Sequence, residues 1–137
     1  MAFCNPDDND IRAFLKRIHH IAVVGLSPKP KRPSHGVAMH LQSFGYHIIP
    51  VRPAIDAVLG EPAFANLKAV HTQIDLVNVF RAPEFVDDIV DTCIDLKLPA
   101  LWLQEGVIHD AAALRAQQAG MFVVMDLCIY KEYKRLI

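Results

Sequence analysis

The sequence predicts an α/β fold: a Rossmann-like, doubly wound, mainly parallel five-stranded sheet with helices on both faces. Short apolar runs alternate along the chain with longer segments in which apolar residues recur at helical spacing. This alternation is typical of βαβ units. The apolar runs are almost unbroken, as in strands that are buried on both faces. We therefore expect the strands to lie side by side between helices.

Size and composition fit one domain. The chain has 137 residues, of which 53% are hydrophobic and 21% are charged. Roughly 100–200 residues per domain is usual, so residues 1–137 are expected to form a single domain. Its 14 basic and 15 acidic residues give a net charge of −1, whereas a duplex-binding domain usually has a basic excess. Nucleic acid is therefore not an expected partner, and the basic run near the C-terminus is interpreted as a solvated helix (Lys131, Lys134 and Arg135).

The cysteines and the N-terminus predict a cytoplasmic location. The three cysteines are widely spaced and odd in number, which does not suggest a disulfide framework, and reduced thiols are usual in the cytoplasm. The acidic N-terminus lacks the apolar stretch of a signal peptide, and no apolar run approaches the ~20 residues of a membrane span. The seven histidines form no H-E-x-x-H motif and there is no Cys-x-x-Cys, so no metal site is predicted.

The first half of the chain predicts two helices and two strands. Apolar residues from Ile11 to Ile18 recur at helical spacing, continuous apolar runs mark the strands, and a glycine after a periodic segment ends a helix. The expected elements are a helix from Asp8 to Arg17, a strand from Ile21 to Gly25, a helix that Ser34 opens and Gly45 ends, and a strand from Tyr46 to Val51.

The second half predicts three further strands, each followed by a helix. A proline is favourable at the first position of a helix, because its missing N–H has no helical partner there. After a loop from Pro53 to Asn66, the expected elements are a strand from Asp75 to Phe80, a helix from Pro83 with Phe85 inward, a strand from Ala100 to Leu103, a helix that Asp110 caps and Gly120 ends, a strand from Phe122 to Met125, and a short C-terminal helix.

The segment from Gly25 to Gly36, between the first strand and the next helix, combines three features of a phosphate site. Gly25 lets the backbone turn sharply and approach a ligand. Ser27 and Ser34 supply hydroxyls, and Ser34 stands at the start of a helix, where free amides attract anions. Positive charge comes from Lys29, Lys31 and Arg32, with no acidic residue in the loop. The alternative interpretation is an ordinary surface loop with solvated lysines.

This segment departs from two common nucleotide motifs. It contains neither G-x-G-x-x-G nor G-x-x-x-x-G-K-[ST]. An NAD site also needs Asp or Glu at the end of the second strand to bind the ribose 2′-hydroxyl, but the chain has Val51, Arg52 and Pro53 there. Arg52 suits a phosphorylated ribose, as in coenzyme A or NADP, or it is a solvated loop arginine.

The ends of the third and fourth strands should meet the same edge of the sheet, where ligands of open α/β sheets bind. Phe80 either borders an adenine ring or packs in the core. Arg81 follows it and is suited to stacking or to a phosphate contact. Gln104 and Glu105 come after the fourth strand and should also face the ligand edge.

The positions of tryptophan and of two cysteines indicate which of these residues belong to the core and which could reach a ligand. Trp102 and Cys93 are expected in the core, from their places in a strand and on the inner face of a helix. Cys128 follows the fifth strand. It either faces the ligand and forms a mixed disulfide with a thiol cofactor, or it is a buried, inert cysteine.

Five pieces of the chain, in this order, resemble the small stand-alone CoA-binding proteins of bacteria. They are V-V-G-L-S-P-K-P-K-R-P-S (Val23 to Ser34), Tyr46 to Pro53, Asp75 to Arg81, W-L-Q-E-G-V (Trp102 to Val107) and V-V-M-D-L-C (Val123 to Cys128). That family is similar to the N-terminal CoA-binding domain of the succinyl-CoA synthetase α subunit. The resemblance covers the chain from about Ile11 to its end, and it implies a Rossmann-like domain that holds coenzyme A across the carboxyl edge of the sheet.

Matched motif by motif, the resemblance also implies site residues. The phosphates would meet Gly25, Ser27, Lys29, Arg32 and Ser34, and the adenosine pocket would be lined by Val51, Pro53 and Phe80, with Arg81 beside it. Two positions depart from the family pattern. Arg52 stands where asparagine often precedes the proline, and Leu127 stands where a basic residue often precedes the cysteine.

The resemblance implies a binding module for coenzyme A or an acyl-CoA and not an enzyme acting by itself. The phosphorylatable histidine and nucleotide-grasp domain of the synthetases lie outside this module. Two alternatives stay open. The first is a minimal NADP-dependent oxidoreductase, which the missing dinucleotide motif and the lack of a substrate domain disfavour. The second is an interaction module that binds no ligand.

Overall fold

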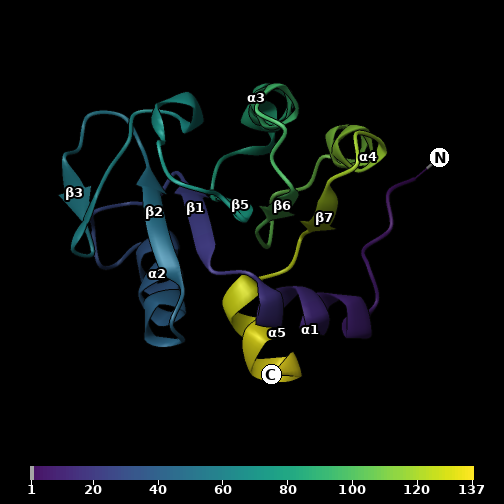
Figure 1. The fold of residues 1–137 in the computed structure, drawn as a ribbon, viewed down its shortest axis with the longest axis horizontal. Coiled ribbons are helices and arrows are strands. Elements are labelled where there is room, and N and C mark those ends of the chain that lie inside the picture. The colour runs from purple at the N-terminus through teal and green to yellow at the C-terminus, as the bar shows by residue number, and fades with distance from the viewer. Residues whose placement is uncertain (1) are drawn as a thin grey trace.

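The five predicted strands form one parallel sheet in the order β2-β1-β5-β6-β7 in the computed structural model of the chain, which describes residues 2–137 (Figure 1). The strands are β1 (His20–Val24), β2 (His47–Val51), β5 (Leu76–Val79), β6 (Ala100–Leu103) and β7 (Phe122–Met125). The predicted Rossmann-like α/β fold is confirmed.

Helices cover both faces of the sheet (Figure 1). One face carries α1 (Asp8–Arg17), α2 (Pro33–Ser43) and α5 (Ile129–Leu136), and the other carries α3 (Val86–Asp95) and α4 (Asp110–Gln118). The chain moves outward from β1 to β2 and then returns to place β5 on the other side of β1. The strand order therefore reverses between β1 and β5, which is where ligands bind in sheets of this kind.

One apolar core lies on each side of the sheet. In β1, Ala22 and Val24 pack with α3 and α4, while Ile21 and Val23 pack with α1, α2 and α5. This alternation follows from the two-residue period of a strand. The core positions predicted for α1 are buried (Ile11, Phe14, Leu15 and Ile18).

Trp102 and Cys93 are fully buried, as predicted. The indole Nε1 of Trp102 donates to the Leu127 carbonyl at 2.7 Å, which satisfies the one polar atom that this side chain carries into the core. Burial raises the pKa of the Cys93 thiol to about 12.

The segment predicted as a loop after Pro53 contains a small hairpin. Its strands are β3 (Ala57–Val58) and β4 (Glu61–Pro62), and a single 3₁₀ turn, η1 (Leu67–Ala69), follows. Leu59 and Gly60 between the strands both have positive φ, 55° and 78°, as in the tight turns that suit hairpins. Strands of two residues are too short to produce a visible alternation in the sequence.

Two helix starts differ from expectation. A 3₁₀ turn, η2 (Pro83–Phe85), precedes α3, and its tighter winding leaves Phe85 40% exposed instead of inward. Asp110 is the first residue of α4 and not its cap. His109 is the cap, and its Nδ1 accepts from the Ala112 N–H at 3.1 Å.

The described histidines include one close pair. Nδ1 of His20 and Nδ1 of His47 lie 2.8 Å apart on neighbouring strands. Within residues 2–137, no three His, Cys, Asp or Glu side chains gather in a way that could hold a metal ion. None of the described helices is long and apolar enough to cross a membrane.

Gly25 follows β1 at a point of very close approach to β5. Its φ is 87°, and its N–H donates to the Val51 carbonyl at 2.9 Å, while the Phe80 N–H donates to the Val24 carbonyl at 2.9 Å. A Cβ at residue 25 would lie 2.4 Å from the Phe80 carbonyl oxygen. Both the dihedral angle and the lack of space therefore require glycine here.

Asp75 ties the start of β5 to the start of β1. Its Oδ2 accepts from the backbone N–H of His19 at 2.9 Å and of His20 at 2.8 Å, and Gln73 Nε2 donates to its Oδ1 at 2.7 Å. Partial burial favours the neutral acid, but these hydrogen bonds outweigh it and hold the pKa of Asp75 below its usual value.

We expect Gly25→Ala to lower the free energy of unfolding by about 2–4 kcal/mol, because a non-glycine residue at positive φ costs about 1–3 kcal/mol and the contact with Phe80 adds to this. Urea denaturation measures the loss. Gly36→Ala is the matched control. Gly36 lies in α2 with nothing within 4 Å of an added Cβ, so this change should be neutral or stabilise by up to about 1 kcal/mol. Equal effects of the two substitutions would contradict the assignment.

We expect Asp75→Asn to destabilise the chain at neutral pH by about 1–2 kcal/mol, through the loss of charge-assisted hydrogen bonds. Because the pKa is lowered on folding, the carboxylate contributes stability above its unfolded pKa of about 3.9, and the contribution disappears as the pH falls below about 4. Unfolding curves from pH 7 to pH 2 should show the variant and the native chain converging. Asp56→Asn, an exposed aspartate with no side-chain hydrogen bond among the described residues, should shift the curve little.

Candidate ligand-binding cleft

A cleft of about 960 Å³ opens at the carboxyl edge of the sheet, between the ends of β1, β5 and β6 and the helices α2 and α5. Sites for small molecules usually have volumes of about 300–1,000 Å³. The cleft therefore lies where the reversal of strand order predicts a ligand, and it has room for a nucleotide-sized molecule.

Eight of the ten predicted site residues line this cleft: Gly25, Ser27, Lys29, Arg32, Ser34, Arg52, Phe80 and Arg81. The other two, Val51 and Pro53, line an adjoining hollow of about 430 Å³. This hollow shares Gly25, Arg52, Phe80 and Arg81 with the cleft. The structure thus brings the ten positions together at one edge, while their contact with a ligand stays a prediction.

The loop after β1 is held in shape by two buried serines. The Ser27 N–H donates to Ser34 Oγ at 2.9 Å, and the Lys29 N–H donates to Ser27 Oγ at 3.1 Å. A hydroxyl that accepts from a backbone amide keeps its own proton to donate. The two serines therefore form the loop and can still donate to an anion in the cleft.

The N-terminus of α2 faces the cleft. The helix begins at Pro33, one residue before the predicted start, and its N-cap residue Arg32 makes no side-chain cap. Pro33 and Ser34 both line the cleft. The positive end of the helix dipole is therefore available to an anionic group there.

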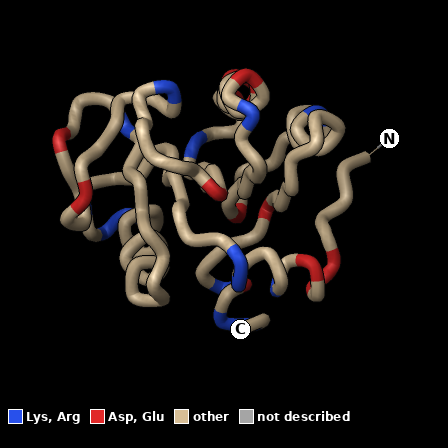
Figure 2. Tube along the Cα trace, in the orientation of Figure 1, with Lys and Arg blue, Asp and Glu red and all other residues tan. Residues whose placement is uncertain are grey.

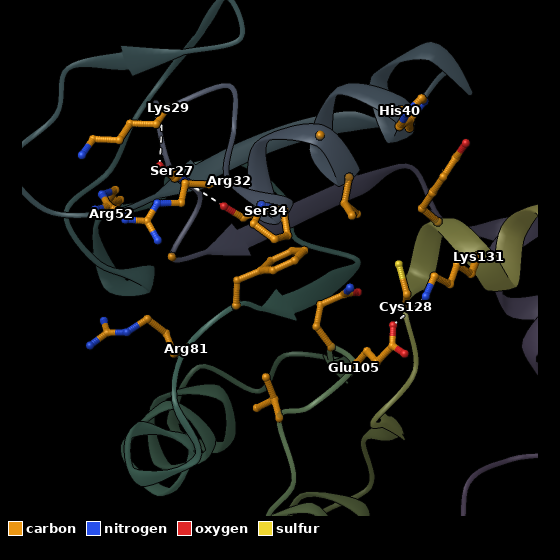
Figure 3. A pocket seen from close by; sticks show the side chains of 18 of the residues that line it. Ser27, Lys29, Arg32, Ser34, His40, Arg52, Arg81, Glu105, Cys128 and Lys131 are labelled. Carbon is orange, nitrogen blue, oxygen red and sulfur yellow. Dashed lines mark hydrogen bonds and ion pairs between the residues drawn. The ribbon is translucent and has the colours of Figure 1, made fainter.

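Four cationic side chains gather at one end of the cleft (Figure 3). They are Lys29, Arg32, Arg52 and Arg81, and none is ion-paired with an acidic residue among residues 2–137. Elsewhere, acidic and basic residues are interspersed along the chain (Figure 2), in agreement with the net charge of −1. The local excess of positive charge makes this end suitable for phosphate groups.

Phe80 and Arg81 border both hollows. Phe80 is half-buried, packs against the core shared with α1, α2 and α5, and also lines the cleft, so core packing and a ligand-facing position are both compatible with the structure. The Arg81 guanidinium lies 4.0 Å from the centroid of the exposed Phe85 ring, which gives this long side chain a preferred position.

The opposite end of the cleft has a different character. Lys131 Nζ donates to Glu105 Oε1 at 2.9 Å, and Figure 3 shows this pair beside Cys128. The thiol of Cys128 is nearly buried but lines the cleft. The His40 ring stacks on Tyr130, with centroids 4.1 Å apart. This end therefore offers a thiol, an aromatic surface and a neutralised ion pair.

Several lining residues were not predicted from the sequence. Gln104 and Glu105 face the ligand edge as expected, but His40, Val107, Tyr130 and Lys131 were missed. His40 and Tyr130 belong to helices, so the rule that sites follow strand ends does not find them. Lys131 was interpreted as part of a solvated helix, although its ammonium reaches the cleft.

Asp126 fixes the turn that leads into α5. It has φ of 62°, its N–H donates to the Leu103 carbonyl at 2.9 Å, and its Oδ1 accepts from the Gly106 N–H at 2.8 Å. The ends of β6 and β7 are thereby tied together, and this determines where Cys128 stands beside the cleft.

Comparison with known proteins agrees with this geometry. A family model described as CoA binding domain matches residues 19–134. The uncharacterized protein YneT of Bacillus subtilis (strain 168) is 42% identical over 125 residues, which are 91% of this chain and 93% of YneT.

The similarity extends to solved structures, among them the following two. The structure called cell-free ID.343 from Thermus thermophilus has a TM-score of 0.91 and 34% identity, and covers 96% of this chain and 100% of its own. A hypothetical protein from Pyrococcus horikoshii OT3 has a TM-score of 0.91 and 31% identity, covering 99% of each chain. Because the family model spans most of the sequence, the chain belongs to the CoA binding domain family.

Proposed function

We propose that this chain binds coenzyme A, free or acylated, in the cleft at the carboxyl edge of the sheet, as a binding module that does not catalyse a reaction by itself. One observation carries the proposal: four cations that have no acidic partner in the described part of the chain, contributed by the loops after β1, β2 and β5, converge on one end of a nucleotide-sized cleft. Coenzyme A bears three phosphate groups on an adenosine and a long neutral arm that ends in a thiol. Its charge distribution matches the two ends of the cleft.

The proposed orientation follows from this match. The phosphates lie near Lys29, Arg32 and the hydroxyls of Ser27 and Ser34, with Arg52 and Arg81 beside them. The adenosine occupies the adjoining hollow, which Val51, Pro53 and Phe80 line. The arm then extends along the cleft toward Glu105, Cys128 and Lys131.

The groups at the thiol end favour holding a ligand over transforming it. The carboxylate among the described lining residues, Glu105, is ion-paired with Lys131, and the His40 imidazole stacks on Tyr130. No hydrogen bond joins a nucleophile to a base among the described residues of the cleft, and such a pair is the usual mark of an activated nucleophile.

The direct test is calorimetric titration of the purified chain with coenzyme A, NADPH and ATP, after native mass spectrometry has shown that no ligand was carried through purification. Binding of coenzyme A that is much tighter than that of NADPH and ATP supports the proposal. Preference for NADPH would favour the oxidoreductase alternative, and failure of a folded, ligand-free chain to bind any of the three would favour an interaction module.

We expect Lys29→Ala/Arg32→Ala to weaken the binding of coenzyme A by roughly 2–4 kcal/mol, since charge-assisted hydrogen bonds contribute about 1.5–3 kcal/mol each and these side chains are partly solvated. Calorimetry measures the change. The control is Lys16→Ala/Arg17→Ala, which removes the same two charges, one lysine and one arginine, from exposed side chains of α1 outside the cleft and should change affinity little. If both double variants weaken binding equally, the loop does not contact the phosphates.

A further inference from the structure

The side-chain amide of Gln104 is held in a fixed orientation at the cleft. It follows β6, is only 4% exposed, and lines the cleft. Its Oε1 accepts two hydrogen bonds, from the backbone N–H of Ile129 at 3.0 Å and from Asn78 Nδ2 at 3.1 Å. A side chain that is held on one side by two donors has little freedom to turn.

The Ile129 backbone N–H determines which atom of the Gln104 side-chain amide is the oxygen and which is the nitrogen. A backbone N–H must donate, so the atom facing it must be the side-chain oxygen. The NH₂ group of Gln104 is then directed away from both partners. No residue among 2–137 accepts a hydrogen bond from Nε2, and Nε2 is not among the buried side-chain atoms without a partner. This donor is therefore unused by the protein and accessible from the cleft.

Asn78 is a polar residue inside an otherwise apolar strand. It is fully buried in the middle of β5, between Val77 and Val79. Its Nδ2 donates to Gln104 Oε1, with a longer contact of 3.4 Å to the Trp102 carbonyl. Its Oδ1 finds no partner among the described residues. Its one strong contact is thus the bond that helps to orient Gln104.

We propose that Gln104 Nε2 is a fixed hydrogen-bond donor for a carbonyl oxygen in the thiol-bearing arm of the ligand, and that Asn78 is a positioning residue for it. The inference deepens the proposed function and rests on it. Two carbonyl classes are available in such a ligand: the amides of the arm itself and the thioester of an acylated thiol. Both accept a hydrogen bond in the same way.

The test compares three ligands by calorimetry on the full chain. Adenosine 3′,5′-bisphosphate has the phosphorylated nucleotide but no arm, coenzyme A adds the amides, and acetyl-CoA adds the thioester. In Gln104→Glu, one carboxylate oxygen still accepts from Asn78 and Ile129, while the other replaces the donor by an acceptor. We expect affinity for coenzyme A or acetyl-CoA to fall about tenfold or more, with affinity for the bisphosphate unchanged within about twofold.

Gln118→Glu is the control for charge, because it makes the same substitution at an exposed position on α4 outside the cleft. It should change none of the three affinities. If Gln104→Glu does not fold, Gln104→Met removes the donor at similar length and allows the same comparison. A loss shared by coenzyme A and acetyl-CoA assigns the donor to an amide carbonyl, and a loss confined to acetyl-CoA assigns it to the thioester.

Equal losses for all three ligands, or no loss for any, would overturn the role of Gln104. The proposal that the native chain binds coenzyme A would still stand. Failure of the native chain to bind any of the three would instead overturn the proposed function and this inference with it. Asn78→Val tests the positioning role: we expect a selective loss of about three- to tenfold for the ligands that have the arm. Unchanged selectivity in a folded Asn78→Val chain would show that Ile129 alone orients Gln104.

Discussion

The close approach of β1 to β5 at Gly25 is the constraint on which the geometry of the site depends. A Cβ there would meet the Phe80 carbonyl at 2.4 Å, so the two strand ends lie too near to each other for any side chain at residue 25. The loop that leaves Gly25 carries Ser27, Lys29 and Arg32, and the segment that leaves Phe80 begins with Arg81. This backbone contact therefore places the starts of the two cation-bearing segments side by side, at the reversal of strand order, where the two loops diverge.

The divergence of these loops gives the cleft two unlike ends. At one end, the positive charges have no acidic partner among residues 2–137, and the N-terminus of α2 adds its dipole. At the other, Glu105 and Lys131 neutralise each other beside Cys128, and Gln104 offers a fixed amide. An elongated ligand with an anionic head and a neutral arm can satisfy both ends in only one direction. The orientation that we propose for the ligand thus rests on electrostatics at one end and on hydrogen bonding at the other.

Most of the fold, and the strand-end part of the candidate site, were predictable because each depends on a strong local pattern. The unbroken apolar runs located all five strands, and the convergence of their carboxyl ends brought Arg52, Phe80 and Arg81 to the same cleft. The β3–β4 hairpin was missed because strands of two residues have no detectable period. Phe85 was misplaced because a 3₁₀ turn winds more tightly than the helix that the pattern predicted. His40 and Tyr130 were missed because their position depends on how helices pack.

Asn78 is a polar residue at a buried strand position where the apolar pattern of the sequence would place a valine. Valine fits the pleated, buried environment on either side of it, and an apolar residue there would avoid an unpaired side-chain oxygen, which costs about 1–3 kcal/mol in a core. No local sequence pattern marks such a residue, because its hydrogen-bond partner, Gln104, lies 26 positions further along the chain. Departures of this kind are expected at functional sites, where stability is given up for a fixed geometry. For this reason we propose that the polar residue in the centre of β5 serves the cleft that Gln104 faces and not the core that surrounds it.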